Sequence, residues 1–288
     1  PGIAATLEKT TLAPAATQPD LVLWPAAVTP WAVRGNADLK AIVESLAVRT
    51  QTPLLLGSIA IEQNGTPGER WFNGAFLVTP EAGLQKDYYS KRRLVPFGEF
   101  VPLRPVLGWL EKFVPIGGDF SRGADSAPLI VPLRGSTAVF GPLICYEDIF
   151  PDLARASALA GSDVLVVLTN NGWFGEGGAA YQHAAHSVLR AVETRRPVLR
   201  CGNGGWSGWI DEFGGVRTVL TNREGSIYFR GTSVASVTRD SRWIGHASFY
   251  TEYGDWFLAV CAVALLLAAM VLHTATAVRP IESLPSPD

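Results

Sequence analysis

The chain alternates short apolar segments with longer segments of helical spacing, and this alternation restricts its fold more than any other feature. Residues 36–50 and 181–196 repeat apolar side chains every three to four positions, which predicts amphipathic helices. In the second segment the predicted apolar face consists of Ala185, Val188, Leu189 and Val192. Between such helices, apolar and β-branched runs predict buried strands at residues 20–24, 53–61, 74–79, 138–147 and 163–170. The pattern predicts an α/β protein with helices on the faces of a sheet.

The pattern changes after the second predicted helix. The segments "PVLRCG", "WSGWID", "VRTVL" and "GTSVASVT" predict short strands and turns with no long helix between them. Parallel strands need long crossover connections, so we expect the sheet to become antiparallel toward its end. One large domain is the simplest expectation for 288 residues.

An uncharged apolar stretch lies near the carboxyl end. Residues 256–272 would span roughly 25 Å as a helix, slightly less than the ~30 Å of a bilayer core. Extension to Val278 gives a sufficient span, with Trp256 and Phe257 at one interface. We therefore expect a transmembrane helix within residues 251–278 and a tail at 279–288, and a buried helix is the alternative.

Composition excludes several functions. Charged residues make up 17% of the chain and the net charge is -2, so no basic surface indicates a nucleic-acid partner. Three cysteines provide neither a disulfide framework nor a C-x-x-C zinc motif, and we expect Cys201 and Cys261 to be packing residues. His183 and His186 have no ligand partner at metal-binding spacing, so we expect a polar helix face there and no metal site.

The remaining cysteine, Cys145, ends an apolar run and is followed by Tyr146, Glu147 and Asp148. A thiol at a strand end has the exposure of a nucleophile, but cysteine is also among the most buried residue types. Local context leaves both readings open.

Two further segments supply polar groups near predicted strand ends, where α/β proteins bind ligands. The segment "YYSKRRLVPFGEFVP", residues 88–102, has the prolines of a rigid loop. Lys91 in this loop could stabilise a thiolate and an oxyanion. The alternative is that its cations form a solvated surface. "NNGWFGEGG" indicates a pocket loop in which Asn171 and Trp173 form part of the wall, with an ordinary turn as the alternative.

Together these motifs resemble a known family. "KRRLVPFGEFVPL", "ICYEDIFPDL", "LTNNGWFG", "QH…RAVETRRPVLR" and "TEYGDWF" occur in the order found in the nitrilase-like domain of bacterial apolipoprotein N-acyltransferases, of the carbon-nitrogen hydrolase superfamily. The resemblance covers residues 5 to about 272. It implies a nitrilase-like αββα sandwich over residues 1–250, one carboxy-terminal transmembrane helix, and a Glu-Lys-Cys triad.

The resemblance also implies a reaction. Cys145 would take an acyl chain from a membrane phospholipid as a thioester and pass it to the amine of a diacylglyceryl-cysteine lipoprotein. Lys91 and a backbone amide near Cys145 would stabilise the oxyanion. Glu99 and Glu147 would orient the lysine and close the pocket, while Tyr146 lies beside the nucleophile and Trp24 joins the pocket wall. No metal or organic cofactor is implied. The expected location is the bacterial inner membrane, with the catalytic domain on the periplasmic side.

Two departures from the family matter. The general-base glutamate should follow Trp24-Pro25, and this chain has Ala26 there, with no carboxylate in the next three positions. We expect severely impaired catalysis, whether the alanine was engineered or arose naturally. The family also carries membrane helices and a first strand before this point, whereas only residues 1–18 precede the strand here. We therefore expect this chain to be truncated at its amino end relative to the family.

Two other functions remain open. A nitrilase-type amidase or hydrolase would resolve the thioester with water instead of a lipoprotein amine. A catalytically inactive lipid-binding homologue would explain Ala26 directly.

Overall fold

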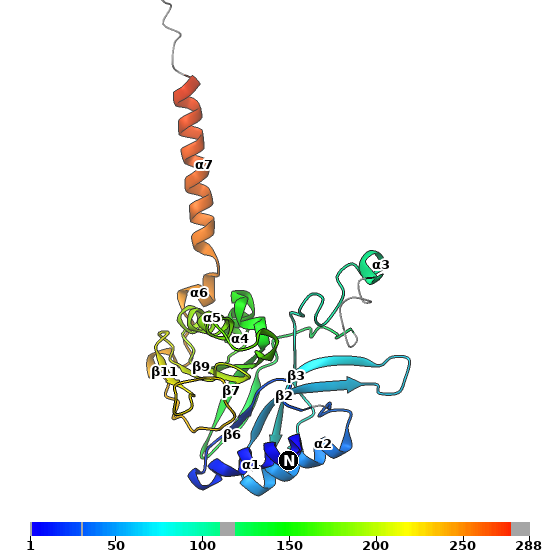
Figure 1. Ribbon diagram of the computed structural model, residues 1–288. Helices are drawn as coiled ribbons and strands as arrows, with labels where there is room; N and C mark the ends of the chain where they lie inside the picture. Colours follow the sequence, from blue (N-terminus) through cyan, green and yellow to red (C-terminus); the bar gives the residue numbers. More distant parts are fainter. Residues whose placement is uncertain (1, 30, 110–118, 278–288) are drawn as a thin grey trace, which may run out of the picture.

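The computed structural model describes residues 2–29, 31–109 and 119–277, and it shows two stacked β-sheets covered by helices on both outer faces (Figure 1). The first sheet has the order β1-β2-β3-β4, and β5 also pairs with β3. Its strands are β1 (Val22–Trp24), β2 (Leu54–Glu62), β3 (Arg70–Thr79), β4 (Gly83–Leu84) and β5 (Tyr89–Ser90). The predicted αββα sandwich is confirmed.

The second sheet has six strands in the order β11-β10-β9-β8-β7-β6. Strands β7, β8 and β9 are parallel neighbours, whereas β9, β10 and β11 pair antiparallel, as the change in pattern predicted. Its strands are β6 (Leu129–Leu133), β7 (Ser136–Ile144), β8 (Val164–Asn170), β9 (Val198–Asn203), β10 (Gly208–Ile210) and β11 (Val216–Val219). The expectation of a strand in "GTSVASVT" is wrong, because residues 231–238 are irregular and largely exposed.

Helix pairs cover the two sheets. Helices α1 (Ile3–Leu12) and α2 (Ala37–Thr50) lie on the first sheet, and α4 (Pro151–Leu159) and α5 (Ala179–Thr194) lie on the second (Figure 1). The short helices α3 (Arg104–Leu107) and α6 (Phe249–Tyr253) lie outside these layers, and α7 (Trp256–Ala277) extends from the body.

Helix α2 forms as its sequence predicts. The Asn36 side chain caps it by accepting a hydrogen bond from the Leu39 amide at 2.8 Å. Leu39, Val43 and Leu46 are buried against the first sheet, and Ile42 is partly buried beside them. The apolar spacing thus identified both the helix and its packed face.

Most of the apolar face predicted for helix α5 is exposed, and of its four members only Val188 packs against the core. Leu189 is 52% exposed and Val192 is 37% exposed. The buried face instead carries Ala180, His183, Ala184, Ser187, Arg190, Ala191 and Thr194. Small residues let this helix approach the second sheet closely, and the polar residues among them hydrogen bond beneath it, which compensates for their desolvation.

Contacts between the sheets align their strand ends. The Cys201 thiol of β9 lies 3.5 Å from the Leu23 carbonyl of β1, and the Asn203 side chain donates to the Ala27 carbonyl at 3.4 Å. Asn203 follows Cys201 in the chain, and its partner Ala27 likewise follows Leu23. The segments of β1 and β9 therefore run in the same direction. The carboxyl ends of β1, β7, β8 and β9 therefore lie at one edge of the sandwich.

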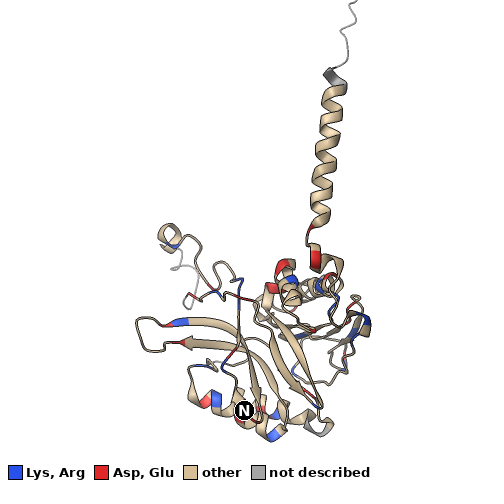
Figure 2. Cartoon of the chain, turned by 180° about the vertical axis from the view of Figure 1, so that it is seen from behind, with Lys and Arg blue, Asp and Glu red and all other residues tan. Residues whose placement is uncertain are grey.

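Helix α7 stands apart from the αββα body (Figure 1) and carries no charged residue along its described length (Figure 2). Its stretch Trp256–Thr274 is long and apolar enough to cross a membrane, and none of its most apolar window is buried against the protein. Gly254, with φ of 62°, separates it from α6, so the expected segment 251–278 begins inside α6. Residue 278 and the expected tail 279–288 lie outside the described residues.

Candidate active site

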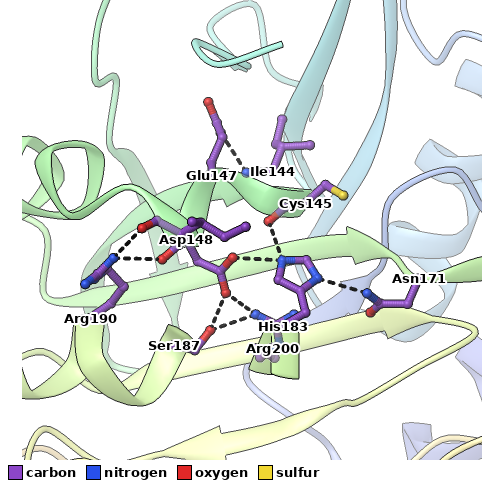
Figure 3. A network of polar contacts seen from close by, with 10 residues as sticks. Ile144, Cys145, Glu147, Asp148, Asn171, His183, Ser187, Arg190 and Arg200 are labelled. Carbon is purple, nitrogen blue, oxygen red and sulfur yellow. Dashed lines mark hydrogen bonds and ion pairs between the residues drawn. The ribbon is translucent and has the colours of Figure 1, made fainter. Parts of the chain in front are cut away.

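Cys145 occupies a sharp turn between a strand and a helix. It directly follows β7 and begins the short 3-10 helix η3 (Cys145–Ile149). Its φ is +56°, a left-handed conformation that residues other than glycine adopt rarely and that the surrounding structure must hold. Its side chain is partly exposed and its sulfur points away from the polar groups beneath it (Figure 3). The turn places this partly buried thiol at the carboxyl end of its strand, outside the fully buried core, which is a position suited to a nucleophile.

Glu147 joins the Cys145 turn to the segment that carries Lys91. Its side chain is fully buried, and one carboxylate oxygen accepts hydrogen bonds from the amides of Arg92 and Arg93 at 2.7 and 3.0 Å. The other oxygen accepts from the Ile144 amide and the Tyr89 hydroxyl, both at 2.8 Å. Burial raises the pKa of Glu147 and outweighs the opposing effect of these hydrogen bonds. Glu147 acts on Lys91 through the backbone, not through contact with its amine.

Lys91 follows β5 and is held by Glu99. The lysine side chain is 1% exposed, and its Nζ donates to Glu99 Oε1 at 2.8 Å. Glu99 also accepts from the Asn73 side chain at 2.6 Å and from the Val95 amide at 2.9 Å. Lys91 therefore belongs to a buried ion pair, and the alternative of a solvated cation does not apply to it.

Tyr146 connects the nucleophile turn with the same loop. Its hydroxyl donates to the Leu94 carbonyl at 2.6 Å, and the Lys91 Nζ lies 5.3 Å from its ring centroid. A cation at this distance is attracted to the ring face. Because Tyr146 directly follows Cys145, these contacts bring the Lys91 amine close to the nucleophile turn.

Ala26 lies in a tightly packed turn after β1. A Cβ atom added to Gly57 of β2 would lie 2.8 Å from the Ala26 Cα, so only glycine fits at position 57. The neighbouring Ala27 carbonyl is bonded by Asn203 of β9, which ties the turn to the sandwich edge where β7 also ends. The position expected for the base is therefore fixed at this edge, and its residue carries no titratable group.

This combination of fold and nucleophile turn agrees with a family match over residues 4–249 to the carbon-nitrogen hydrolase model. The chain belongs to the carbon-nitrogen hydrolase family. Similar solved structures include a carbon-nitrogen hydrolase from Helicobacter pylori G27, at 17% identity and a TM-score of 0.55, covering 76% of this chain and 81% of that one. A mutant amidase from Nesterenkonia sp. AN1 has 16% identity and a TM-score of 0.53, with coverage of 74% and 80%. At such identity these structures support the fold alone.

Curated relatives of this carbon-nitrogen hydrolase carry a narrower name. The apolipoprotein N-acyltransferase of Geobacter metallireducens is 36% identical over 260 residues, covering 90% of this chain and 47% of the relative. That of Pseudomonas aeruginosa LESB58 is 32% identical over 255 residues, covering 88% and 46%. The chain spans about half the length of the curated relatives it matches.

The residues expected in the pocket wall lie in different environments. Trp24 is 4% exposed, packs in the core beneath α1 and α2, and donates from its indole to Thr11 Oγ1 at 3.0 Å. This placement corrects the expectation for Trp24, which faces the helices of the first sheet. Asn171 is fully buried, whereas Trp173 on the following turn is 78% exposed.

A buried polar network beneath Cys145 was missed by sequence reasoning (Figure 3). Asp148 is fully buried and accepts from His183 Nε2 at 2.9 Å, from Ser187 Oγ at 2.7 Å and from Arg200. Burial acts to raise the pKa of Asp148, but the charge of Arg200 and these hydrogen bonds outweigh it and hold that pKa below its ordinary value. The polar helix face expected at His183 exists, but it faces the interior, since the His183 side chain is 7% exposed. The sequence did carry one signal of this network: the polar residues His183, Ser187, Arg190 and Thr194 lie on one face of the helix.

The remaining thiol of the body differs from Cys145. Burial raises the pKa of Cys201 to about 12, so this thiol stays protonated and unreactive at neutral pH. Among the described residues, no group of three histidine, cysteine or carboxylate side chains is arranged to hold a metal ion. Cys145 is the better candidate of the two for covalent chemistry.

Proposed function

We propose that this chain is the catalytic part of an apolipoprotein N-acyltransferase, which moves an acyl chain from a phospholipid to the amino terminus of a diacylglyceryl lipoprotein. The observation that carries the proposal is the exposed apolar helix α7 attached to a carbon-nitrogen hydrolase body. An acyl donor that resides in a membrane accounts for this combination. The names of the curated relatives support the same activity.

The first half-reaction uses the Cys145 turn. The thiolate attacks the ester carbonyl of the phospholipid, and the resulting oxyanion is stabilised by the Lys91 ammonium and by a backbone amide next to Cys145. The C–O bond then breaks, the lysophospholipid oxygen takes up a proton, and a thioester remains on Cys145. Glu99 and Glu147 keep Lys91 in place, the first through its amine and the second through the adjacent backbone.

The second half-reaction releases the acyl group. The free amine of the diacylglyceryl-cysteine attacks the thioester carbonyl and an amide C–N bond forms. The C–S bond breaks, and the departing Cys145 thiolate takes up the proton that the amine loses. A covalent intermediate divides one difficult acyl transfer into two easier ones. Lys91 stabilises the oxyanion in both halves.

Ala26 limits this chemistry. The base that would deprotonate Cys145 and later the acceptor amine belongs at this position, and alanine cannot accept a proton. General-base assistance typically contributes about 10²- to 10⁴-fold, so we expect the chain to be impaired by a factor of this order.

The proposal includes a location. Helix α7 would anchor the chain in a bacterial inner membrane, with the catalytic body on the periplasmic side, where lipoprotein amino termini and phospholipids meet. Trp256 and Phe257 begin α7 and are 43% and 61% exposed, which suits aromatic contacts at a membrane interface.

The test uses the Ala26→Glu variant in phospholipid vesicles with a synthetic diacylglyceryl lipopeptide. Mass spectrometry of the products should show the N-acylated lipopeptide, and the matched Ala26→Glu chain carrying Cys145→Ser should yield none. Free fatty acid without acylated lipopeptide would indicate a hydrolase instead. Lipid binding with neither product would indicate an inactive homologue.

A further inference from the structure

The His183 ring touches the backbone of the nucleophile itself. Its Nε2 lies 3.2 Å from the Cys145 carbonyl oxygen and 2.9 Å from Asp148 Oδ1 (Figure 3). On the other side of the ring, Nδ1 lies 2.9 Å from the Asn171 side-chain nitrogen. The ring is held on both edges and is almost completely buried.

These contacts define which ring nitrogen carries the hydrogen. Both partners of Nε2 are oxygen acceptors, so Nε2 carries a hydrogen and donates to the Asp148 carboxylate and the Cys145 carbonyl. Asp148 fixes the donor because Arg200 and Ser187 hold the opposite carboxylate oxygen. The network therefore directs one hydrogen-bond donor at the Cys145 carbonyl.

The direction of that carbonyl determines the direction of the next amide. In a planar trans peptide the C=O and N–H bonds point in opposite directions. Because the Cys145 oxygen is bound to His183, the Tyr146 N–H must point away from the network. The Cys145 thiol also points away from it (Figure 3). Tyr146 lies in the first turn of η3, where an amide has no acceptor within the helix.

We propose that His183 is a positioning residue for the oxyanion site: by holding the Cys145 carbonyl, it aims the Tyr146 N–H at the oxygen that develops negative charge. The inference rests on the proposed acyl chemistry at Cys145. The left-handed φ of Cys145 makes such a support necessary, since this conformation persists only where surrounding contacts impose it. His183 never touches the substrate.

Two thiol reagents separate this role from general thiol reactivity. Acrylamide forms an S–C bond while its carbonyl oxygen gains the charge of an enolate, which later takes a proton from water at carbon. Methyl methanethiosulfonate forms an S–S bond and releases methanesulfinate, with no carbonyl oxyanion. Both reagents need the same thiolate, so the ratio of their rates at Cys145 reports oxyanion stabilisation.

The variants separate the role of His183 from that of its neighbours. His183→Ala removes the donor to the carbonyl, and His183→Gln keeps an N–H at the Nε2 end of the side chain. His186→Ala changes the partly exposed histidine of the same helix and is the matched control. Labelling of Cys201, whose thiol lies between the two sheets against the Leu23 carbonyl, identifies any sample that has unfolded.

We expect His183→Ala to lower the acrylamide rate at least about tenfold relative to the methanethiosulfonate rate, since loss of one oxyanion donor costs about 10²- to 10³-fold. His183→Gln should recover most of the ratio, and His186→Ala should leave it unchanged. Equal slowing by both reagents, or no change in the ratio, would overturn the proposal. Because neither reagent is a lipid, failure of the acyl-transfer assay alone would refute the proposed function and leave this result standing.

Discussion

The Glu147 carboxylate accepts a hydrogen bond from the backbone amide of Arg92 at 2.7 Å, which ties the residue after Lys91 to the turn that carries Cys145. The same side chain also binds the Ile144 amide, directly before the thiol. Nucleophile and cation come from different sheets, and this buried carboxylate is the bridge between them. Their relative position therefore depends on Glu147, although it touches neither functional atom.

Replacing this bridge should destabilise the fold. Glu147→Gln substitutes an amide NH₂ for one acceptor oxygen, so at least one buried donor loses its partner. Loss of a buried hydrogen-bond partner typically costs about 1–3 kcal/mol, which denaturant unfolding of the chain would measure. Glu176→Gln, at an exposed glutamate, is the matched control and should change stability by less than about 0.5 kcal/mol. Equal stability of the two variants would contradict the bridging role.

The neighbouring buried acids should affect stability with opposite pH dependence. The pKa of Glu147 is raised above 4.5 in the folded state, so its contribution falls as pH rises from 4.5 through the raised value. The pKa of Asp148 is lowered below 3.8, so its contribution is present above 3.8 and is lost as pH falls through the lowered value. Relative to the parent, Glu147→Gln should be more destabilising at acidic pH and Asp148→Asn more destabilising at neutral pH. Unfolding free energies of Glu147→Gln at pH 4 and pH 7, and of Asp148→Asn at about pH 2 and pH 7, test this, and equal destabilisation at the two pH values of either pair would contradict it.

Lys91 should be indispensable for chemistry. In the Ala26→Glu background, Lys91→Met removes the charge that stabilises the oxyanion, and we expect acyl-thioester formation to fall by about 10²-fold or more. Lys91→Arg should not restore it, because the side chain is 1% exposed and a larger guanidinium does not fit beside Glu99. Single-turnover rates measure the effect. Retention of the rate in Lys91→Met would exclude the lysine from the mechanism.

Sequence reasoning identified the elements whose signals are local. The apolar spacing of α2, the presence of strand β7 and the uncharged run of α7 each follow from neighbouring residues, although β7 ends at Ile144 and not at residue 147 as predicted. It also singled out Lys91, which the structure pairs with Glu99. These features need no knowledge of distant contacts.

It failed where burial of polar groups depends on tertiary partners. Leu189 and Val192 looked like the buried face of α5, yet His183 and Ser187 are buried because Asp148 and Arg200 meet them from other elements. No local pattern reports such compensation. Trp24 was misplaced for a related reason, because strand alternation does not say which face of β1 meets the helices.

Helix α7 should determine membrane attachment. Leu265→Arg places a charge near the middle of the uncharged helix, where it costs about 2.5–3.5 kcal/mol. We expect less of this variant in the membrane fraction after alkaline carbonate extraction, whereas Leu265→Ala should remain there. Equal recovery of both variants in the membrane would show that α7 is not the anchor.

The most direct test of the account is whether Cys145 carries an acyl group once the base position is restored. The Ala26→Glu chain, incubated with phospholipid vesicles and no acceptor, should gain the mass of one acyl chain on the peptide containing Cys145, sensitive to neutral hydroxylamine. The parent chain should gain it about 10²- to 10⁴-fold more slowly. A chain that remains unmodified at Cys145 after Ala26→Glu, while folded and bound to the vesicles, would contradict the account.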